Sequence, residues 1–291
     1  MQTTKRLEAA LNRLQMTVGT QRQPKLSDKR FDQAHEAFED SSCQQGMILE
    51  WLQTFAAQHP HTGSLRILSI GCGSGILDRQ LIKSLATKEA RQVEYAAIDP
   101  NSVACDRFRV DFESLGLKNV NLDLQKETVE SMDFDARFDI IQAVHSVYYF
   151  ADPATSIDQL LAQLGPKGKL VIFQAPMAEL NRLADCFWGH QKKADIWYSE
   201  RLSAHLQEAG LTHAKTRING RIDVAPCFAA ESSCGEMILD FITQVDCRSM
   251  PTLLRGEVKE CLLSISEKAG THVWAPHPVD VFVIDAPPPM K

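Results

Sequence analysis

Leu65-Arg66-Ile67-Leu68-Ser69-Ile70-Gly71-Cys72-Gly73-Ser74-Gly75 carries the clearest structural signature in this chain. Six residues of strand character run into a glycine-rich turn, and the later run Val93-Glu94-Tyr95-Ala96-Ala97-Ile98-Asp99 is a second apolar strand that ends on a carboxylate. Glycine permits a tight turn and a close approach of the backbone to a ligand. A carboxylate at the end of the second strand suits the two hydroxyls of a ribose. The pattern predicts half of a nucleotide-binding α/β sheet, with Gly71, Gly73, Gly75 and Asp99 at an adenosine-type cofactor.

The spacing of the glycines distinguishes three kinds of cofactor site. A dinucleotide site of the G-x-G-x-x-G type needs its third glycine at position 76, where this chain has Ile76. A phosphate-binding P-loop needs Lys followed by Ser or Thr, whereas the turn is followed by Ile-Leu-Asp-Arg. The G-x-G-x-G pattern is similar to that of class I methyltransferases. This resemblance implies S-adenosyl-L-methionine as the cofactor and S-adenosyl-L-homocysteine as its product.

Composition and charge narrow the class of protein further. The 291 residues are 44% hydrophobic, and no apolar run approaches the length of a membrane span. The formal net charge is −6 and Lys and Arg form no concentrated stripe, which argues against a nucleic-acid partner. The eight cysteines include no Cys-x-x-Cys pair, as expected for reduced thiols and not for a zinc site. We therefore expect a monomeric cytoplasmic enzyme with no metal ion, no nucleic-acid partner and no membrane partner.

Hydrophobic periodicity organises the rest of the chain. Residues 1–26 are expected to form a weakly anchored leader, and residues 27–291 a class I methyltransferase domain. Strands are predicted at 65–70, 93–98, 119–123, 138–144, 168–174, 213–224 and 279–285, with helices at 75–87, 101–115, 153–164 and 199–209. This alternation predicts an α/β fold with a Rossmann-like, doubly wound, mostly parallel seven-stranded sheet whose last strand is antiparallel. Ligands bind beyond the carboxyl ends of such parallel strands.

Three segments are additional to a minimal sheet of this kind. Residues 27–58, 176–198 and 226–272 are expected to form a helical cover over the strand ends, and such covers select the methyl acceptor. A compact helical cover suits a small enclosed molecule better than a protein or RNA surface. For residues 254–268 the alternative is a helix that packs on the sheet.

Several runs of sequence resemble the histamine N-methyltransferase family. They are Ile67-Leu68-Ser69-Ile70-Gly71, Gln125-Lys126-Glu127-Thr128, Ile141-Gln142-Ala143-Val144-His145-Ser146-Val147-Tyr148-Tyr149, Asp240-Phe241-Ile242-Thr243 and Phe282-Val283-Ile284-Asp285-Ala286, and they are colinear from about Ser27 to Ala286. The resemblance implies that Thr128 or Val129 lies beside the adenine and that Val144 touches the cofactor. The residues taken alone also allow a core role for Val144 and a helix-cap role for Thr128.

The resemblance also implies an acceptor site, and this chain departs from the family there. The family binds its amine through a carboxylate, a glutamine and an asparagine, and the corresponding positions are Gln44 (or Cys43), His145 and His277. Loss of the carboxylate removes the charge that would hold an ammonium group. The two histidines could instead bind a carboxylate or phenolate, or one could act as a catalytic general base near neutral pH. Two imidazoles with a third ligand could also bind a metal, but no third ligand is clearly placed.

Aromatic side chains fall at or near the positions that line the family's acceptor pocket. They are Phe31, Tyr148, Tyr149, Trp188 and Phe241. Aromatic faces suit a flat ring or a cation, although aromatics at the ends of helices and strands also fill cores. For Phe241 both interpretations stay open. Tyr148 and Tyr149 directly follow the strand whose end is expected to face the cofactor.

Three functions are compatible with these observations. The first is methyl transfer to a small molecule, at the nitrogen of an aromatic or heterocyclic amine of the imidazole type. The second is O-, S- or carboxyl-methylation of another small acceptor, with His145 or His277 as base. The third is a catalytically silent sensor or partner subunit that binds S-adenosylmethionine. The chain lacks the Asn/Asp-Pro-Pro-Tyr/Phe motif of nucleic-acid and glutamine methylation, which argues against a macromolecular acceptor.

Overall fold

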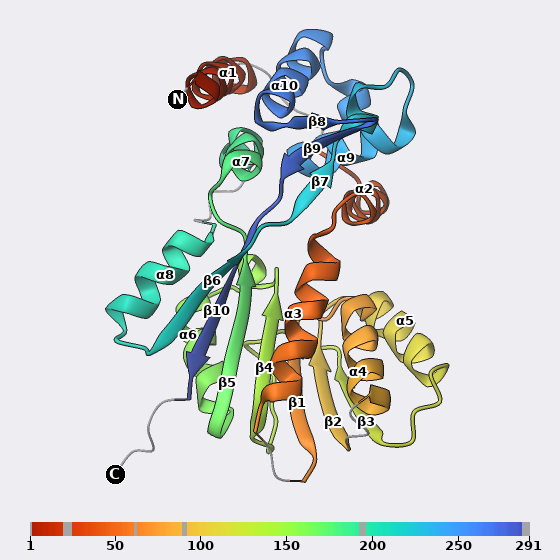
Figure 1. Ribbon diagram of the computed structural model, residues 1–291, viewed down its shortest axis with the longest axis vertical. Coiled ribbons are helices and arrows are strands. Elements are labelled where there is room, and N and C mark those ends of the chain that lie inside the picture. Colours follow the sequence, from red (N-terminus) through yellow and green to blue (C-terminus); the bar gives the residue numbers. More distant parts are fainter. Residues whose placement is uncertain (1, 20–24, 61–62, 89–91, 192–195, 287–291) are drawn as a thin grey trace. The chain divides into compact units, whose positions relative to one another are not determined.

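The computed structural model describes residues 2–19, 25–60, 63–88, 92–191 and 196–286 (Figure 1). The chain forms two compact units, and both are assembled from segments that are distant in sequence. Unit 1 comprises Met1–Gln45, Ala175–Ile196 and Ile218–Val279, and unit 2 comprises Gly46–Gln174, Trp197–Arg217 and Asp280–Lys291.

Unit 2 is built on a seven-stranded sheet with the strand order β3-β2-β1-β4-β5-β10-β6. The strands are β1 (Leu65–Ile70), β2 (Val93–Ile98), β3 (Val120–Gln125), β4 (Phe138–Val144), β5 (Leu164–Gln174), β6 (His213–Ile218) and β10 (Val279–Asp285) (Figure 1). The strands β1 to β5 pair in parallel, and β10 pairs with β5 in the antiparallel direction. The predicted Rossmann-like sheet with an antiparallel last strand is confirmed.

Helices follow the strands of unit 2 where the sequence predicts them. They are α4 (Ile76–Lys88), α5 (Ser102–Glu113), α6 (Pro153–Ala162) and α8 (Ser199–Glu208). A further helix, α3 (Gln44–Gln58), precedes β1, and a short 3-10 helix, η1 (Val147–Tyr149), follows β4. Asn101 caps α5 by accepting the N–H groups of Val103 and Ala104, and Asp152 caps α6 ahead of a proline in its first turn. These side-chain caps satisfy backbone N–H groups in the first turns and so fix the residues at which α5 and α6 begin.

A buried polar network joins three strands and one helix of unit 2. The hydroxyl of Tyr95 on β2 donates to Asp78 Oδ1 on α4 at 2.6 Å, and Gln142 Nε2 on β4 donates to the Tyr95 hydroxyl at 3.0 Å. Gln142 also contacts the hydroxyl of Ser69 on β1 at 3.3 Å. Burial raises the pKa of the Asp78 carboxyl. Because no water reaches these groups, each depends on its protein partners.

Unit 1 combines helices with a small three-stranded sheet. Its helices are α1 (Gln2–Gly19), α2 (Asp28–Asp40), α7 (Glu179–Gln191), α9 (Ser233–Thr243) and α10 (Thr252–Ile265), with the 3-10 helices η2 (Ala225–Phe228) and η3 (Cys247–Ser249). Its sheet has the order β7 (Arg221–Asp223), β9 (His272–Pro276) and β8 (Glu267–Ala269). Helix α2 packs on α9, while α1 and α7 pack on α10. The helix that covers most of residues 254–268 therefore belongs to the core of unit 1, with Leu254, Val258 and Leu262 fully buried.

Three parts of the chain differ from the sequence-based expectation. Residues 1–26 are expected to be a weakly anchored leader, whereas residues 2–19 form α1, which buries Leu7, Leu11 and Leu14. Their helical spacing places these leucines on one face, and Glu8 adds an ion pair to Arg182 at 2.7 Å. The predicted strand at 213–224 is divided between β6 and β7, which lie in different sheets. Strand β8 lies in a segment expected to be helical, and its three exposed residues have no alternating pattern that would reveal it.

Replacement of Tyr95 by Phe tests the buried network. The Y95F variant keeps the ring but removes the hydroxyl, so Asp78 loses its shortest hydrogen bond. We expect the free energy of unfolding to fall by about 1–3 kcal/mol, because a buried polar group is left with fewer partners. Urea unfolding of the wild type and Y95F gives this difference. An unchanged unfolding midpoint would show that the network contributes no net stability.

Candidate functional site

The glycine turn after β1 has a backbone that only glycine adopts easily. The φ angles of Gly71, Gly73 and Gly75 are 70°, 54° and 68°. A Cβ atom at Gly71 would lie 2.6 Å from the Cβ of Ser146, and one at Gly75 would lie 2.4 Å from the ring of Phe108. A Cβ at Gly73 would meet no atom within 4 Å. Packing therefore requires glycine at positions 71 and 75, whereas a Cβ atom at position 73 would point into open space.

Asp99 is held at the end of β2 by two backbone amides. The N–H of Gly73 donates to Asp99 Oδ2 at 2.8 Å, and the N–H of Asn101 donates to Oδ1 at 2.8 Å. A carboxylate has about four acceptor positions, so capacity remains for two hydroxyl donors. The half-buried carboxylate thus lies against the glycine turn in a defined orientation. This arrangement fits the ribose of an adenosine-type cofactor.

Three other predicted cofactor residues have different surroundings. Val129 is buried in the core of unit 2, and Val144 is the half-buried last residue of β4. Thr128 is exposed, and its hydroxyl contacts that of Ser131 at 3.1 Å in a turn. The possible helix-cap role of Thr128 is wrong, because no helix follows it. Val144 is not fully buried, which leaves it available to a ligand at the carboxyl end of β4.

His145 lies directly beyond β4 and has an unusual backbone. Its φ of 51° is in the left-handed region, and its N–H donates to the carbonyl of Phe173 at 3.0 Å. Its ring stacks on that of Tyr148 with a centroid distance of 6.2 Å, and Nδ1 lies 3.4 Å from the Tyr148 hydroxyl. Tyr149 is 70% exposed and contacts Tyr148 edge-on. Because Ser146 packs against Gly71, this group lies beside the glycine turn.

Gln44 and His277, which the resemblance places in the acceptor site, are joined in unit 1. Gln44 Nε2 donates to the backbone carbonyl of His277 at 2.7 Å, and His277 Nδ1 lies 2.7 Å from the hydroxyl of Ser42. The N–H of His277 donates to the carbonyl of Gly220 at 2.8 Å. Both Gln44 and His277 are buried. The amide of Gln44 therefore positions the His277 backbone.

Phe31 and Phe241 also come together in unit 1, in a cluster of rings between α2 and α9. The centroids of Phe31 and Phe241 are 5.8 Å apart, and Phe241 also lies 5.0 Å from His35 and 4.6 Å from Phe38. Phe38 in turn contacts His277 edge-on at 4.9 Å. Trp188 lies in α7, and its side chain is outside the described part of the structure. Sequence reasoning missed His35 and Phe38, although their spacing of four and seven residues from Phe31 is a helical signal.

Glu39 is a second feature that sequence reasoning missed. Burial and the charge of Asp40 raise the pKa of its carboxyl from 4.5 to about 7. Glu39 Oε1 lies 3.8 Å from His35 Nε2, and burial lowers the pKa of His35. The cluster therefore carries a carboxyl group whose ionisation is sensitive to pH near neutrality.

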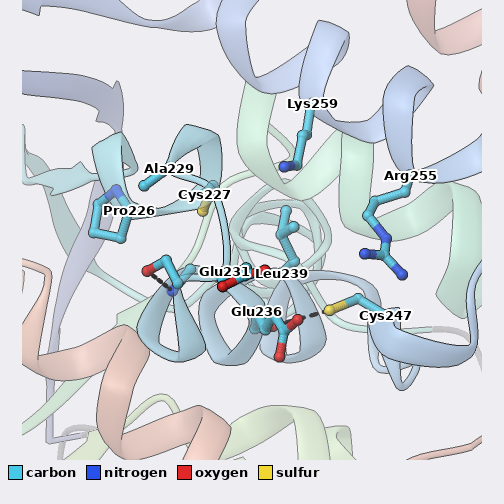
Figure 2. A pocket seen from close by; sticks show the side chains of 11 residues that line it. Pro226, Cys227, Ala229, Glu231, Glu236, Leu239, Cys247, Arg255 and Lys259 are labelled. Atoms are coloured by element: carbon cyan, nitrogen blue, oxygen red, sulfur yellow. Dashed lines mark hydrogen bonds between the residues drawn. The ribbon is translucent and has the colours of Figure 1, made fainter. Parts of the chain in front are cut away.

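Unit 1 also contains a small cavity that holds none of the predicted site residues. In Figure 2 the side chains of Arg255 and Lys259, from α10, lie in the upper part of the view, and those of Glu231 and Glu236 lie below them. The cavity volume is about 60 Å³, whereas pockets for cofactors and drug-sized ligands measure about 300–1,000 Å³. This cavity is too small for an adenosine-type cofactor. Within the described ranges, no three His, Cys, Asp or Glu side chains are grouped to hold a metal ion.

Removal of the Asp99 carboxylate tests the cofactor site. The D99A variant should bind S-adenosylmethionine about 10- to 100-fold more weakly, because charge-assisted hydrogen bonds to the ribose are lost. The exposed Asp158 on α6 provides a matched control, D158A, which should keep the wild-type dissociation constant. Isothermal calorimetry measures all three proteins. Equal affinity of D99A and the wild type would show that Asp99 does not hold the ribose.

The raised pKa of Glu39 predicts a pH-dependent effect on stability. The folded state favours the protonated carboxyl, so the wild type should lose stability relative to E39Q as the pH rises from 4.5 to about 7. We expect a relative change of about 1–3 kcal/mol in the free energy of unfolding. Urea unfolding at intervals across this range measures it, with E36Q, at an exposed position of the same helix, as control. A constant difference between E39Q and the wild type would contradict the prediction.

Comparison with known proteins agrees with this geometry. The methyltransferase domain family matches residues 21–215, well over half of the chain. The chain is 21% identical to the histamine N-methyltransferase of Danio rerio over 257 residues, which cover 80% of this chain and 86% of that protein. It is 34% identical to a ubiquinone biosynthesis O-methyltransferase of Nitrobacter winogradskyi over 106 residues, which cover 36% of this chain and 37% of that enzyme.

The similarity extends to solved structures. The N-methyltransferase NodS from Bradyrhizobium japonicum WM9, solved with S-adenosylhomocysteine, superposes with a TM-score of 0.50 and 15% identity. The match covers 89% of this chain and 100% of NodS, and at this identity it supports the fold. The family match, which covers well over half of the chain, leads to one assignment. The chain belongs to the methyltransferase domain family and is an S-adenosylmethionine-dependent methyltransferase.

Proposed function

We propose that this enzyme methylates a small aromatic or heterocyclic molecule, at the nitrogen of an amine of the imidazole type. The observation that carries the proposal is the position of His145 and Tyr148 at the end of β4, beside the glycine turn. A non-glycine residue in the left-handed region costs about 1–3 kcal/mol, and such strain is concentrated at functional sites. The relationship to a histamine N-methyltransferase over most of the chain supports a nitrogen acceptor.

The proposed site residues have separate tasks. Gly71, Gly73, Gly75 and Asp99 would hold the cofactor, which supplies a methyl group already activated on a sulfonium. Alignment of the acceptor lone pair and exclusion of water would then provide most of the rate enhancement. A nitrogen nucleophile needs only to lose a proton before or after transfer, and His145 beside the Tyr148 hydroxyl would accept it.

The ring cluster and its neighbours form the proposed recognition site for the acceptor. Phe31 and Phe241 offer half-buried aromatic faces that suit a flat ring. His277, held by Ser42 and Gln44, adds an imidazole of fixed orientation. Tyr149 and Trp188 stay predicted contacts of the acceptor.

O-methylation is the second candidate. The 34% identity to an O-methyltransferase of ubiquinone biosynthesis favours it, although that similarity covers little over a third of the chain. A hydroxyl acceptor needs a base, and His145 would fill that role. The third interpretation, a sensor without turnover, differs from both because it predicts cofactor binding without any methylated product.

The cysteines and the helices of the chain bear on the proposed cellular location of the enzyme. None of the eight cysteines, all of them among the described residues, forms a disulfide, which supports a reducing compartment such as the cytoplasm. No helix in the described residues is long and apolar enough to cross a membrane. The monomeric state stays a prediction.

Turnover of S-adenosylmethionine with a panel of small acceptors tests the proposal. We expect product with imidazoles or arylamines, and little with phenols, carboxylates and thiols. The H145A variant should lower kcat by about 100-fold or more, because proton transfer loses its acceptor, while cofactor affinity stays unchanged. The control H213A alters a histidine on the edge strand β6.

Three results would contradict the proposal. Product with phenols alone would favour O-methylation, and an unchanged kcat in H145A would remove His145 from the chemistry. Cofactor binding without product for any acceptor would favour the sensor.

A further inference from the structure

The contact between the glycine turn and the end of β2 carries a free thiol on each partner. Cys72 lies between Gly71 and Gly73 in the turn, and its Sγ donates to the backbone carbonyl of Gly73 at 3.7 Å. The Sγ of Cys105, near the start of α5, donates to the backbone carbonyl of Asp99 at 3.3 Å. The N–H of Gly73 in turn binds the Asp99 carboxylate at 2.8 Å. Each thiol is therefore bonded directly to a residue of the predicted cofactor site.

The two thiols also interact with each other. Burial and the charge of Asp99 raise the pKa of the Cys105 thiol, while a hydrogen bond with the Cys72 thiol acts in the opposite direction. The ring of Phe108 on α5 packs so closely on the turn that a Cβ atom at Gly75 would lie 2.4 Å from it. The packing of α5 against the turn thus holds the backbones that carry the two thiols close together.

The surroundings of the pair favour a neutral sulfur species. Burial raises the pKa of the Cys72 thiol, as it does that of Cys105. Both thiols are therefore slow to ionise, but a disulfide carries no charge and burial does not oppose it. Cys72 is half-buried, whereas Cys105 is fully buried. A water-soluble oxidant therefore reaches Cys72 first.

We propose that Cys72 and Cys105 form a redox modification site, at which a disulfide bond between them weakens binding of the cofactor. This inference goes beyond the proposed acceptor chemistry, and it rests on the proposed role of Gly73 and Asp99 in holding the cofactor. The oxidant is a peroxide, and a small thiol such as glutathione reverses the reaction by thiol–disulfide exchange.

The oxidation removes two electrons from the two sulfur atoms. Hydrogen peroxide converts the Cys72 thiol to a sulfenic acid and releases one water molecule. The Cys105 sulfur then attacks the Cys72 sulfur, so that an S–S bond forms while the S–O bond of the sulfenic acid breaks. The hydroxide that leaves combines with the proton of the Cys105 thiol to give a second water molecule. Peroxide is thereby reduced to two molecules of water.

The new bond changes the geometry around the Asp99 carboxylate. The sulfur atoms of a disulfide lie about 2.0 Å apart, so the bond draws the turn and α5 together. It also removes both S–H groups, and with them the hydrogen bonds to the carbonyls of Gly73 and Asp99. The N–H of Gly73 and the carboxylate of Asp99 then shift relative to each other. Because both groups are proposed to hold the cofactor, its affinity falls.

Peptide mapping tests whether the bond forms. Trypsin cleaves after Lys and Arg, so residues 67–79 and 92–107 become separate peptides, each with one cysteine of the pair. After treatment of the full chain with hydrogen peroxide, we expect these two peptides to be linked, and dithiothreitol to separate them. C72S and C105S should not give the linked pair. The control C234S, at another half-buried cysteine, should give it as the wild type does.

Calorimetry with S-adenosylhomocysteine tests the effect on the cofactor. The oxidised wild type and C234S should bind it about 10-fold or more weakly than their reduced forms, because the contacts around Asp99 are displaced. Dithiothreitol should restore the affinity. C72S and C105S should keep one dissociation constant before and after oxidation. Thermal unfolding of each protein in each state shows whether it is folded.

A measurement on the wild type alone gives the reciprocal effect. In a glutathione redox buffer, saturating S-adenosylhomocysteine should shift the equilibrium from the disulfide toward the thiols. The factor should equal the ratio of the two dissociation constants, because the coupling between cofactor and disulfide is mutual. An equal fraction of linked peptides with and without S-adenosylhomocysteine would contradict the proposal.

Failure of the redox site is distinguishable from failure of the cofactor site. Absence of the linked peptides from the oxidised wild type overturns the redox site, whatever the affinity. Linked peptides with unchanged affinity also overturn it, and the cofactor site then stands. If C72S or C105S loses as much affinity on oxidation as the wild type, another cysteine is responsible. The D99A variant, measured in the reduced state, tests the ribose contact without the disulfide.

Discussion

The backbone turn at residues 71–75 ties together the ends of three neighbouring parallel strands. The N–H of Gly71 donates to the carbonyl of Ile98 at 2.9 Å, the N–H of Gly73 binds the Asp99 carboxylate, and Gly71 leaves no room for a Cβ beside Ser146. Because β2, β1 and β4 are parallel, their carboxyl ends share one edge of the sheet. The Asp99 carboxylate, which is proposed to bind the cofactor, and the Ser146 backbone that follows His145 are placed by this one set of contacts.

Ion pairs and hydrogen bonds divide the polar residues into structural and functional groups. Asp78 is satisfied by Tyr95, and Asp240 by Arg30, so both carboxyl groups are committed to holding their own unit together. Glu39 differs, because its ion-pair contact is a histidine, His35, and not an arginine.

The proposed acceptor residues illustrate how far local sequence reasoning extends. Helical spacing within α2 contains the signal for His35 and Glu39 beside Phe31, but no pattern links that helix to Phe241, some two hundred residues later. The contact exists because α2 packs on α9 within unit 1. Likewise, residues 213–224 form two strands because β6 pairs in the seven-stranded sheet and β7 pairs in the three-stranded sheet. A propensity scale contains no information about the partner strand, so it does not predict this division.

The sequence by itself determined the glycine turn and the position of Asp99, because both depend on residues within one βαβ segment, and the alternation of strands and helices along the chain predicted the α/β sheet. It also indicated a nitrogen-methylating family through colinear resemblance. Only the tertiary structure decided that one face of α1 is buried, that Thr128 caps no helix, that Gln44 holds His277, and that Phe241 lies against the rings of α2. Those outcomes depend on contacts between segments far apart in the chain, where packing and desolvation override local preference.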